Sequence, residues 1–456
     1  MSGIPSTWLE TTLGAVVTYG TAAKAAPDEI AADTWVLELE DIEKDTTKVL
    51  QRVTFAERQS KSSKNRFDAG DVLYGKLRPY LNKVAFADRP GVCTTEIVPI
   101  KPNEKVNARY LFHWLRHPKF LTYVTEVSHG VNMPRLGTEA GRQAPFVLAP
   151  KNEQKRIADK LDTVLTRVDA VNIRLARVAP ILKRFRQSVL AAATSGRLTE
   201  DWRQEMLGIE RHEYQITEIS VPYPQHITGP ECWKLHIFDQ AVDLVGGSQP
   251  PKTTFLQDEQ PGYVRLIQIR DYKSDRHLTY IPRALARRFC SATDVMIGRY
   301  GPPIFQILRG LEGAYNVALM KAVPRNGLLT NDYLYHWLQR EDLLRFVEAG
   351  SDRTAGQDGV RKEHLVKYPL FVPTVPEQTE IVRRVETLFA FADRLDARVK
   401  TAQAAAERLT PALLSKAFRG ELVTQDPKDE PASELLRRLQ QEAPSTGTKR
   451  GRNSSA

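Results

Sequence analysis

The sequence predicts an α+β protein in which two mixed α/β domains are separated by two long antiparallel coiled-coil helices, built as a pseudo-two-fold tandem repeat. Three observations support this prediction. With 456 residues, the chain is too long for one compact core. One long segment recurs at a fixed offset along the sequence. The apolar residues of that segment follow the period of a coiled-coil seam.

The composition is that of a folded protein with a moderate positive charge. Hydrophobic residues make up 41% of the chain, which argues against wholesale disorder. The 65 Lys and Arg residues against 55 Asp and Glu residues give a net charge of +10, which makes an anionic partner plausible without identifying it. Cys93, Cys232 and Cys290 are widely spaced, which argues against a disulfide framework and against a zinc site.

The sequence also lacks the signals of export and membrane insertion. No basic region followed by a continuous apolar run stands near Met1, and no stretch of about 18 consecutive apolar residues occurs. We therefore expect a cytoplasmic protein, which agrees with the few and unpaired cysteines.

The repeated segment, Glu153–Leu198, aligns without a gap onto Glu377–Leu422, a shift of 224 residues. Both copies begin with Glu-Gln and end with Gly-x-Leu, at Gly196 and Gly420. Glycine is typical of the position just after a helix C-terminus. Each copy therefore predicts one long helix, which would run roughly 48 Å between its first and last seam residues at 1.5 Å per residue.

Apolar residues in both copies recur at alternating steps of four and three. Small residues in the second copy would let the helices approach closely, so we expect the two copies to pack on each other. Two separate amphipathic helices, each covering its own domain, are the alternative. Pro180 and Pro411 should each kink a helix or cost a backbone hydrogen bond. The predicted seam residues are Ile157, Leu161, Val164, Val168, Leu175, Leu182 and Phe185 in the first copy and Ile381, Val385, Leu388, Leu395, Val399, Leu409 and Leu413 in the second.

The blocks before the two helices also correspond. Trp8 matches Trp233, and Ala69–Lys76 matches Ala292–Arg299. The sequence therefore predicts a domain, its helix, a hydrophilic linker, a second domain, its helix and a tail whose end, from about Pro444, we expect to be disordered. The corresponding boundaries are 1–150, 151–199, 200–228, 229–372, 373–426 and 427–456.

Three motifs carry a family resemblance. Each long helix begins with a Pro-x-x-Glu-Gln pattern, as Pro150–Gln154 and, one residue longer, Pro373–Gln378. The second helix ends with Ala417–Leu422, and Lys61–Phe67 is followed by Gly70–Leu81. In this order and in duplicate, the motifs resemble the specificity subunits of Type I restriction-modification enzymes over nearly the whole chain.

The resemblance implies a division of labour between subunits. Each α/β domain would be a target-recognition domain that reads one half of a bipartite, asymmetric DNA target, and the helices would fix the gap between the halves. The chain would bind double-stranded DNA and would catalyse no reaction itself. Its partners would be two modification subunits, which methylate adenine, and restriction subunits, which translocate and cleave DNA. S-adenosylmethionine, ATP and magnesium would be bound by those partners and not by this chain.

In the first domain, basic and polar residues gather in two stretches and one later loop. Such side chains can contact phosphates or base edges, and only base-edge contacts carry sequence information. An ordinary charged surface and a mobile connecting loop are the alternatives. The candidates for DNA contact are Lys61, Ser62, Lys64, Asn65 and Arg66, then Lys76, Arg78, Tyr80, Asn82 and Lys83, and finally Asn132 and Arg135.

In the second domain, the candidates follow the ends of two predicted strands and continue into a loop between Gly350 and Lys362. This loop could enter a groove of the duplex, and a connecting loop without a DNA role is the alternative. The candidates for DNA contact are Arg270, Tyr272, Lys273, Arg276, Arg299, Tyr300, Arg353, Gln357 and Lys362.

No catalytic or metal-binding constellation stands out. Gly70–Lys76 has most of a phosphate-binding loop, but Leu77 stands where Ser or Thr must bind the metal. Gly301–Ile304 lacks the Asn or Asp of an amino-methyltransferase motif, and the nine histidines show no zinc-ligand spacing. The competing hypotheses are a coiled-coil interaction scaffold without sequence-specific DNA recognition and a DNA enzyme with an unrecognised site.

Overall fold

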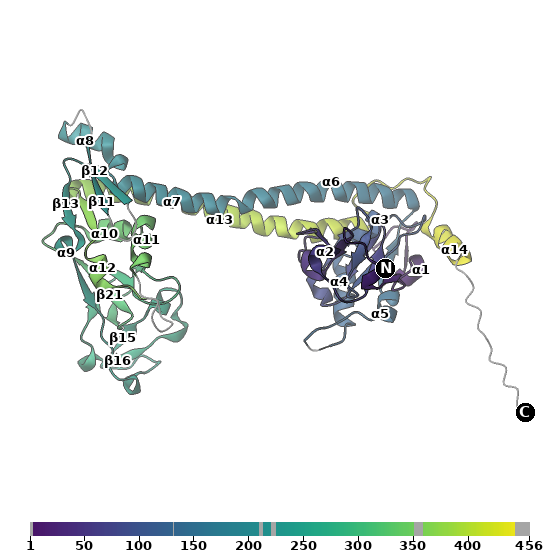
Figure 1. Cartoon of the computed structure of the whole chain (residues 1–456), viewed down its shortest axis with the longest axis horizontal. Coiled ribbons are helices and arrows are strands. Elements are labelled where there is room, and N and C mark those ends of the chain that lie inside the picture. Colours follow the sequence, from purple (N-terminus) through teal and green to yellow (C-terminus); the bar gives the residue numbers. More distant parts are fainter. Residues whose placement is uncertain (1–2, 131, 209–212, 220–224, 351–358, 443–456) are drawn as a thin grey trace, which may run out of the picture. The chain divides into compact units, whose positions relative to one another are not determined.

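The structure is a computed structural model that describes residues 3–130, 132–208, 213–219, 225–350 and 359–442. The chain divides into two compact units. Unit 1 comprises residues 1–176 and 401–456, and unit 2 comprises residues 177–400. Each unit joins one mixed α/β domain to parts of the long helices (Figure 1).

The α/β domain of unit 1 is built from three sheets and short helices. Its strands are β1 (Leu9–Thr12), β2 (Lys24–Ala25), β3 (Trp35–Leu37), β4 (Val53–Thr54), β5 (Lys64–Phe67), β6 (Val72–Gly75), β7 (Val84–Phe86), β8 (Gly91–Cys93), β9 (Ile97–Ile100) and β10 (Pro145–Leu148), and its helices are α1 (Leu13–Val16), α2 (Phe55–Arg58), α3 (Ala108–Trp114), α4 (Pro118–Glu126) and α5 (Thr138–Gln143). A five-stranded sheet has the order β2-β5-β8-β3-β4, and a three-stranded sheet has the order β7-β6-β9. Strand β1 pairs antiparallel with β10, which leads into the first long helix.

The α/β domain of unit 2 repeats this plan. Its strands are β11 (Tyr214–Ile219), β12 (Gln225–Pro230), β13 (Lys234–Ile237), β14 (Val242–Gly246), β15 (Tyr263–Ile267), β16 (Tyr280–Pro282), β17 (Phe289–Cys290), β18 (Val295–Gly298), β19 (Gln306–Leu308), β20 (Gly313–Tyr315), β21 (Leu319–Pro324) and β22 (Pro369–Val372), and its helices are α9 (Phe238–Ala241), α10 (Asn331–Leu338), α11 (Glu341–Ala349) and α12 (Lys362–Leu365). One sheet has the order β16-β15-β20-β17, the other β14-β21-β18-β19, and β13 pairs antiparallel with β22.

The two domains share their strand order and the one parallel pair in it. Strands β4-β3-β8-β5 of unit 1 correspond to β16-β15-β20-β17 of unit 2, and the pairs β3–β8 and β15–β20 are both parallel. Each core surrounds an aromatic-rich helix, with Tyr110 and Trp114 buried in α3 and Tyr333 and Trp337 buried in α10. The predicted tandem repeat of mixed α/β domains is confirmed.

The long helices are α6 (Lys151–Ala176), α7 (Val178–Thr194) and α13 (Val375–Phe418). The first predicted helix is interrupted at Arg177, because Pro180 offers no N–H to the carbonyl of Ala176. Helix α13 continues past Pro411 without a break, so only one of the two prolines divides its helix.

The long helices run antiparallel in both units. In unit 1, Ile157 near the start of α6 shares a core with Leu414 near the end of α13. In unit 2, Leu190 near the end of α7 shares a core with Ile381 near the start of α13. The ion pair between Arg186 and Asp393 adds a link between α7 and α13. Packing of the two copies on each other, and not on separate domains alone, is therefore confirmed.

The predicted seam holds at both ends but slips along α13. Ile157, Leu161, Val168, Leu182, Ile381 and Val385 are buried, and Val164, Leu175, Phe185, Leu388, Leu395, Val399 and Leu413 are half-buried. Leu409 is 47% exposed, so its assignment to the seam is wrong. Buried positions continue instead through Ala406, Leu414 and Ala417, because a straight helix of 3.6 residues per turn drifts away from a strict 3.5-residue repeat.

Two segments differ from their predicted character. The expected linker, 200–228, contains α8 (Glu200–Leu207), β11 and β12, and its residues 209–212 and 220–224 lie outside the described part of the chain. The expected tail contains α14 (Ala432–Glu442), which packs on unit 1 through Ala432 and Leu435, whereas residues from 443 onward lie outside the described part. Within the described residues, no helix combines the length and the apolar character needed to cross a membrane.

Candidate nucleic-acid interface

In unit 1, the structure brings together two candidate stretches that are far apart in sequence. The chain after β6 lies beside the loop that follows α4, with a bridge between Leu77 and Arg135. The backbone N–H of Arg78 donates to the carbonyl of Pro134 at 2.7 Å, and the N–H of Leu136 donates to the carbonyl of Lys76 at 2.9 Å. We call Lys76, Arg78, Tyr80, Asn132 and Arg135 the turn-and-loop face of unit 1.

The turn-and-loop face presents polar side chains on a tight backbone. Arg78 and Asn82 both adopt left-handed conformations, with φ of 50° and 48°, and they flank the 3-10 turn Pro79–Leu81. This turn leaves Arg78 and Tyr80 exposed, and Tyr80 retains 47% of its surface. An exposed arginine and tyrosine on a rigid turn are well placed to contact a nucleic acid.

The basic stretch before the face divides between solvent and the domain interior. Lys61, Ser62 and Arg66 are exposed. Lys64 is buried, and its Nζ donates to Oε1 of Glu38 at 2.8 Å. The amide of Asn65 donates to the carbonyl of Ile97 at 3.0 Å. The side chains of Lys64 and Asn65 therefore hold strand β5 in place within the free protein.

Two further candidates of unit 1 are partly withdrawn from solvent. Nζ of Lys83 donates to the carbonyl of Leu39 at 2.7 Å, and Asn82 is half-buried in the turn. Arg135 remains exposed, although its Nε donates to Glu96 at 3.1 Å. A contact of this kind at the surface is easily exchanged for a phosphate, because exposed ion pairs contribute little free energy.

Unit 2 builds the same face with different residues. The backbone N–H of Val360 donates to the carbonyl of Arg299 at 2.9 Å, and Tyr300 bridges to Gly359. The guanidinium of Arg299 stacks over the ring of Tyr300 at 5.2 Å, and both residues are half-buried. The loop before α12 therefore meets the turn after β18, as the loop after α4 meets the turn after β6.

The remaining candidates of unit 2 differ in exposure. Arg270, Lys273 and Arg276 are exposed around the 3-10 turns 269–272 and 275–277, while Tyr272 is half-buried and its burial raises the pKa of its hydroxyl. Nζ of Lys362 donates to the carbonyl of Leu244 at 2.9 Å. Arg353 and Gln357 lie outside the described residues.

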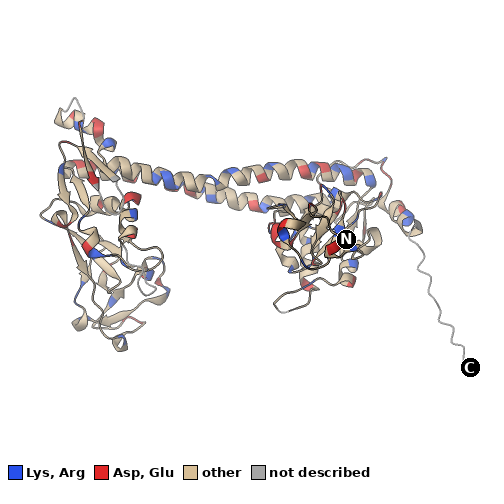
Figure 2. Cartoon of the chain, in the orientation of Figure 1, with Lys and Arg blue, Asp and Glu red and all other residues tan. Residues whose placement is uncertain are grey.

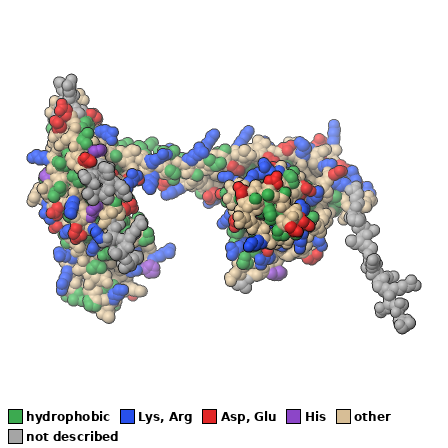
Figure 3. All heavy atoms as spheres, in the orientation of Figure 1, with side chains coloured by type: hydrophobic (Ala, Val, Ile, Leu, Met, Phe, Trp, Pro, Cys, Tyr) green, Lys and Arg blue, Asp and Glu red, His purple; other side chains and the backbone are tan. Residues whose placement is uncertain are grey.

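Positive charge also follows the long helices, which the candidate set left out. Lys and Arg are spread over both units with Asp and Glu between them (Figure 2), and basic side chains project along the long helices (Figure 3). The exposed ones on α6 and α7 include Lys155, Lys160, Arg167, Arg174, Lys183 and Arg184. Their sequence signal was a series of basic residues at positions between the apolar seam residues.

Each long helix is anchored to its domain by a tryptophan and a glutamate. Nε1 of Trp8 donates to Oε2 of Glu153 at 2.8 Å, and Nε1 of Trp233 donates to Oε2 of Glu377 at 2.8 Å. All four side chains are buried. The sequence alignment matched these residues in pairs, but it did not predict that the tryptophan and the glutamate of one copy touch each other.

The glutamine that follows each glutamate ties the helix to the aromatic-rich helix of the domain. Oε1 of Gln154 accepts from the backbone N–H of Asn107, the N-cap of α3, at 2.9 Å. Oε1 of Gln378 accepts from the backbone N–H of Thr330, the N-cap of α10, at 2.8 Å. The Glu-Gln pair therefore fixes where each long helix leaves its domain.

The glycine at each helix exit packs on a proline at the start of a domain. Gly196 and Gly420 have φ of 79° and 78°, a conformation that favours glycine. A Cβ atom on Gly196 would collide with Pro230, and one on Gly420 would collide with Pro5. We call these two contacts the exit joints of unit 2 and unit 1.

The electrostatic surroundings of the two anchors differ. In unit 2, Oε1 of Glu377 accepts from Nη1 of Arg203 at 2.5 Å and from the hydroxyl of Thr199 at 2.8 Å. In unit 1, Oε1 of Glu153 has no hydrogen-bond partner among the described residues, and burial raises the pKa of this carboxyl. Within the described residues, no group of three His, Cys, Asp or Glu side chains is placed to hold a metal ion.

Comparisons with known proteins agree with this architecture. A family model for the Type I restriction modification DNA specificity domain matches residues 28–178. The Type I restriction enzyme EcoBI specificity subunit of Escherichia coli is 30% identical in an alignment of 390 residues that covers 81% of this chain and 79% of that protein.

Two solved structures share the fold. A chain in a structure of the type I R-M system has a TM-score of 0.69 at 19% identity and covers 92% of this chain and 99% of its own. The HsdS subunit from Thermoanaerobacter tengcongensis has a TM-score of 0.55 at 20% identity and covers 92% of this chain and 98% of its own.

Proposed function

Because the chain belongs to the family of Type I restriction enzyme specificity subunits, we propose that it is the sequence-specific DNA-binding subunit of such an enzyme. It reads a bipartite, asymmetric DNA target and directs the subunits that modify and restrict the DNA. The observation that carries this proposal is the turn-and-loop face, which is built twice on the same scaffold. The interaction scaffold without sequence-specific recognition offers no reason for this duplication.

Each turn-and-loop face supplies the contacts to one half of the target. Exposed Arg and Lys side chains bind phosphates, and the same groups together with Tyr and Asn read base edges where they reach a groove. The residues at equivalent positions differ, since Lys76 and Leu77 of unit 1 stand where unit 2 has Arg299 and Tyr300. Different side chains on equal scaffolds favour an asymmetric target.

The long helices couple the binding of one half-site by unit 1 to the binding of the other half-site by unit 2. Two modules joined by a stiff connection bind together only where the DNA presents both half-sites at a matching separation. The buried anchors Trp8–Glu153 and Trp233–Glu377 support this role, because a helix that is tied to its domain by buried hydrogen bonds transmits orientation as well as distance.

Catalysis belongs to partner subunits in this proposal. Two modification subunits bind S-adenosylmethionine and methylate adenine, and restriction subunits bind ATP and magnesium and cleave DNA. The present chain binds double-stranded DNA and these partners in the cytoplasm, holds no cofactor and catalyses no reaction. The long helices, with their exposed basic side chains, are the surface available to the partners.

Methylation mapping tests the proposal. We expect cells that carry this chain and its modification subunit to methylate adenine at one bipartite sequence. Replacing Arg66 and Arg78 with alanine should relax or abolish the half-site read by unit 1 and leave the other half-site unchanged, because each base contact contributes about 1–3 kcal/mol. Lys119→Ala, an exposed lysine of unit 1 outside the candidate set, is the control.

Two results would contradict the proposal. Absence of site-specific methylation in the presence of the modification subunit would favour the scaffold without DNA recognition. Equal loss at both half-sites in the Arg66→Ala and Arg78→Ala variants would reject modular reading by unit 1.

A further inference from the structure

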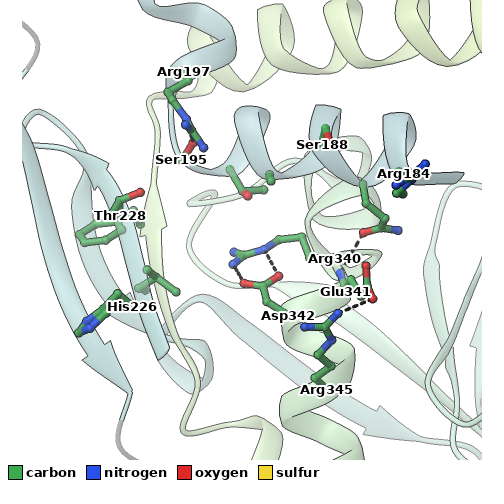
Figure 4. A pocket seen from close by; sticks show the side chains of 15 residues that line it. Arg184, Ser188, Ser195, Arg197, His226, Thr228, Arg340, Glu341, Asp342 and Arg345 are labelled. Carbon is green, nitrogen blue, oxygen red and sulfur yellow. Dashed lines mark hydrogen bonds and ion pairs between the residues drawn. The ribbon is translucent and has the colours of Figure 1, made fainter. Parts of the chain in front are cut away.

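A hollow of about 530 Å³, lined by polar and apolar side chains, lies within unit 2, between α7, β12 and the start of α11. One wall is α7 with Arg184 and Ser188, and the facing wall is β12 with His226 and Thr228 (Figure 4). Arg340 lies between these walls. A volume of this size accommodates a few side chains of a binding partner.

The equivalent place in unit 1 is filled by an aromatic side chain. Phe418, near the end of α13, is buried against Trp114 at 4.9 Å and against His117 at 5.3 Å between ring centroids. The offset of the repeat places Thr194 of α7 at the position of Phe418. The smaller Thr194 does not fill the space between the helix end and the domain, so unit 2 keeps a hollow there.

The hollow carries more positive than negative charge. Asp342 is engaged by Arg340 through Nε at 3.0 Å and by the hydroxyl of Tyr368 at 3.2 Å, and Glu341 is engaged by Arg345 at 2.7 Å. No carboxylate of the described residues pairs with Arg184 or with Arg197, which also lines the hollow.

We propose that this hollow binds an acidic peptide segment of a partner protein, with carboxylate side chains held by Arg184 and Arg197. The inference rests on the proposed function, under which the partner is the modification subunit that docks beside the long helices. The planar guanidinium of arginine matches a carboxylate through two parallel hydrogen bonds.

The shape of the hollow favours a peptide over a DNA duplex. The phosphates of a duplex lie on a convex surface and contact arginines that project outward. Arg184 and Arg197 are exposed, but Arg340 between the walls is only 8% exposed, and Ile227 and Phe371 add apolar surface to the lining. A peptide can insert an acidic side chain next to an apolar one and use both kinds of surface.

Charge reversal of the two arginines tests the inference. The full-length chain carrying Arg184→Glu and Arg197→Glu is titrated with the purified modification subunit by calorimetry. We expect binding to weaken roughly ten- to hundred-fold, because like charges would then face each other in the hollow. Arg287→Glu is the matched control, since Arg287 is an exposed arginine of unit 2 that lies neither on the long helices nor in the lining of the hollow, and it should change binding little.

A second variant changes the shape of the hollow instead of its charge. Thr194→Phe installs the residue that unit 1 carries at the equivalent position, and it should weaken binding of the modification subunit without altering net charge. A circular-dichroism melt of each variant verifies that unit 2 is folded.

Three outcomes would overturn the inference. The first is normal binding of the modification subunit by both the double variant and Thr194→Phe. The second is normal assembly with reduced affinity for DNA, which would assign the hollow to the duplex. The third is failure of the unaltered chain to bind the modification subunit at all, and only this outcome would reject the proposed function as well.

Discussion

Glu153 in unit 1 and Glu377 in unit 2 begin the long helices at equivalent positions, yet among the described residues only Glu377 has a buried counter-charge. Arg203 reaches Glu377 because α8 follows directly after α7 and folds back onto unit 2. The corresponding segment of unit 1, before α14, brings Asp429, which pairs with Arg156 and adds no positive charge beside Glu153. The Trp–Glu anchor therefore contributes differently to the stability of the two units, because the segment after the long helix supplies a buried arginine to the glutamate in unit 2 and none in unit 1.

Removal of the counter-charge in unit 2 should have the largest effect. Arg203→Met leaves a buried carboxylate unpaired, and the loss of one partner from such a pair costs about 3–5 kcal/mol. Chemical denaturation should therefore report a free energy of unfolding of unit 2 that is lower by that amount. The double variant Arg203→Met with Glu377→Gln should recover much of the loss.

The matched substitution in unit 1 is Arg156→Met. Arg156 pairs with Asp429 at 2.6 Å and keeps about a third of its side chain exposed. Asp429 is buried but also accepts from the amide of Asn152 at 3.1 Å, so we expect a smaller loss of about 1–2 kcal/mol. Equal losses for Arg156→Met and Arg203→Met would contradict the difference between the anchors.

The second largest effect concerns two equivalent histidines in acid. Burial, aided by Arg309, lowers the pKa of His336 to about 4, and its ring nitrogens have no hydrogen-bond partner among the described residues. The folded state thus binds this proton less tightly than the unfolded chain, whose histidine has a pKa near 6.5. The contribution of neutral His336 to the free energy of unfolding is therefore fully present above pH 6.5. It falls as the pH drops toward 4 and is lower by roughly 2 kcal/mol at pH 5.

His113 is the comparison in unit 1. Burial lowers its pKa as well, but Asp162 at 2.8 Å from Nε2 opposes the shift. The unaltered chain should lose melting temperature between pH 7 and pH 5. This loss should shrink more in His336→Phe than in His113→Phe. A greater reduction of the pH dependence in His113→Phe would contradict the assignment of the larger acid effect to His336.

The smallest effect should come from Glu153 itself. Its raised pKa means that the folded state favours the protonated carboxyl, so the charged form lowers stability as the pH rises above the pKa of the unfolded chain. Glu153→Gln keeps an acceptor for Trp8 and should be neutral or stabilising by on the order of 1 kcal/mol at pH 7. Glu377→Gln, which leaves Arg203 unpaired, should destabilise unit 2, and opposite signs in urea titrations of the two variants would sharpen the comparison.

Features that depend on periodicity and repetition could be predicted from the sequence. The offset of 224 residues predicted both long helices, and buried residues such as Ile157 and Ile381 confirmed the seam. The assignment of Leu409 failed because a helix of 3.6 residues per turn drifts from a strict 3.5-residue repeat, and the apolar pattern itself does not show where a position leaves the seam.

The candidate site was harder to predict, because exposure is decided by partners that are distant in sequence. Lys61 and Lys64 look alike in the sequence, but Lys64 turns inward to Glu38 across the sheet. The pairing of Arg203 with Glu377 joins residues from different elements and leaves no periodic signal. The meeting of Leu77 with Arg135 likewise depends on chain folding and not on either stretch alone.

The exit joints of the two units show how the chain can be connected. Gly196 and Pro230 of unit 2 belong to neighbouring parts of the sequence, whereas Gly420 and Pro5 of unit 1 are separated by most of the chain. The same contact thus forms whether or not the polypeptide is continuous across it. A half-length chain that carries both surfaces would therefore close this joint with a second copy of itself, and joining two such chains would require no new surface.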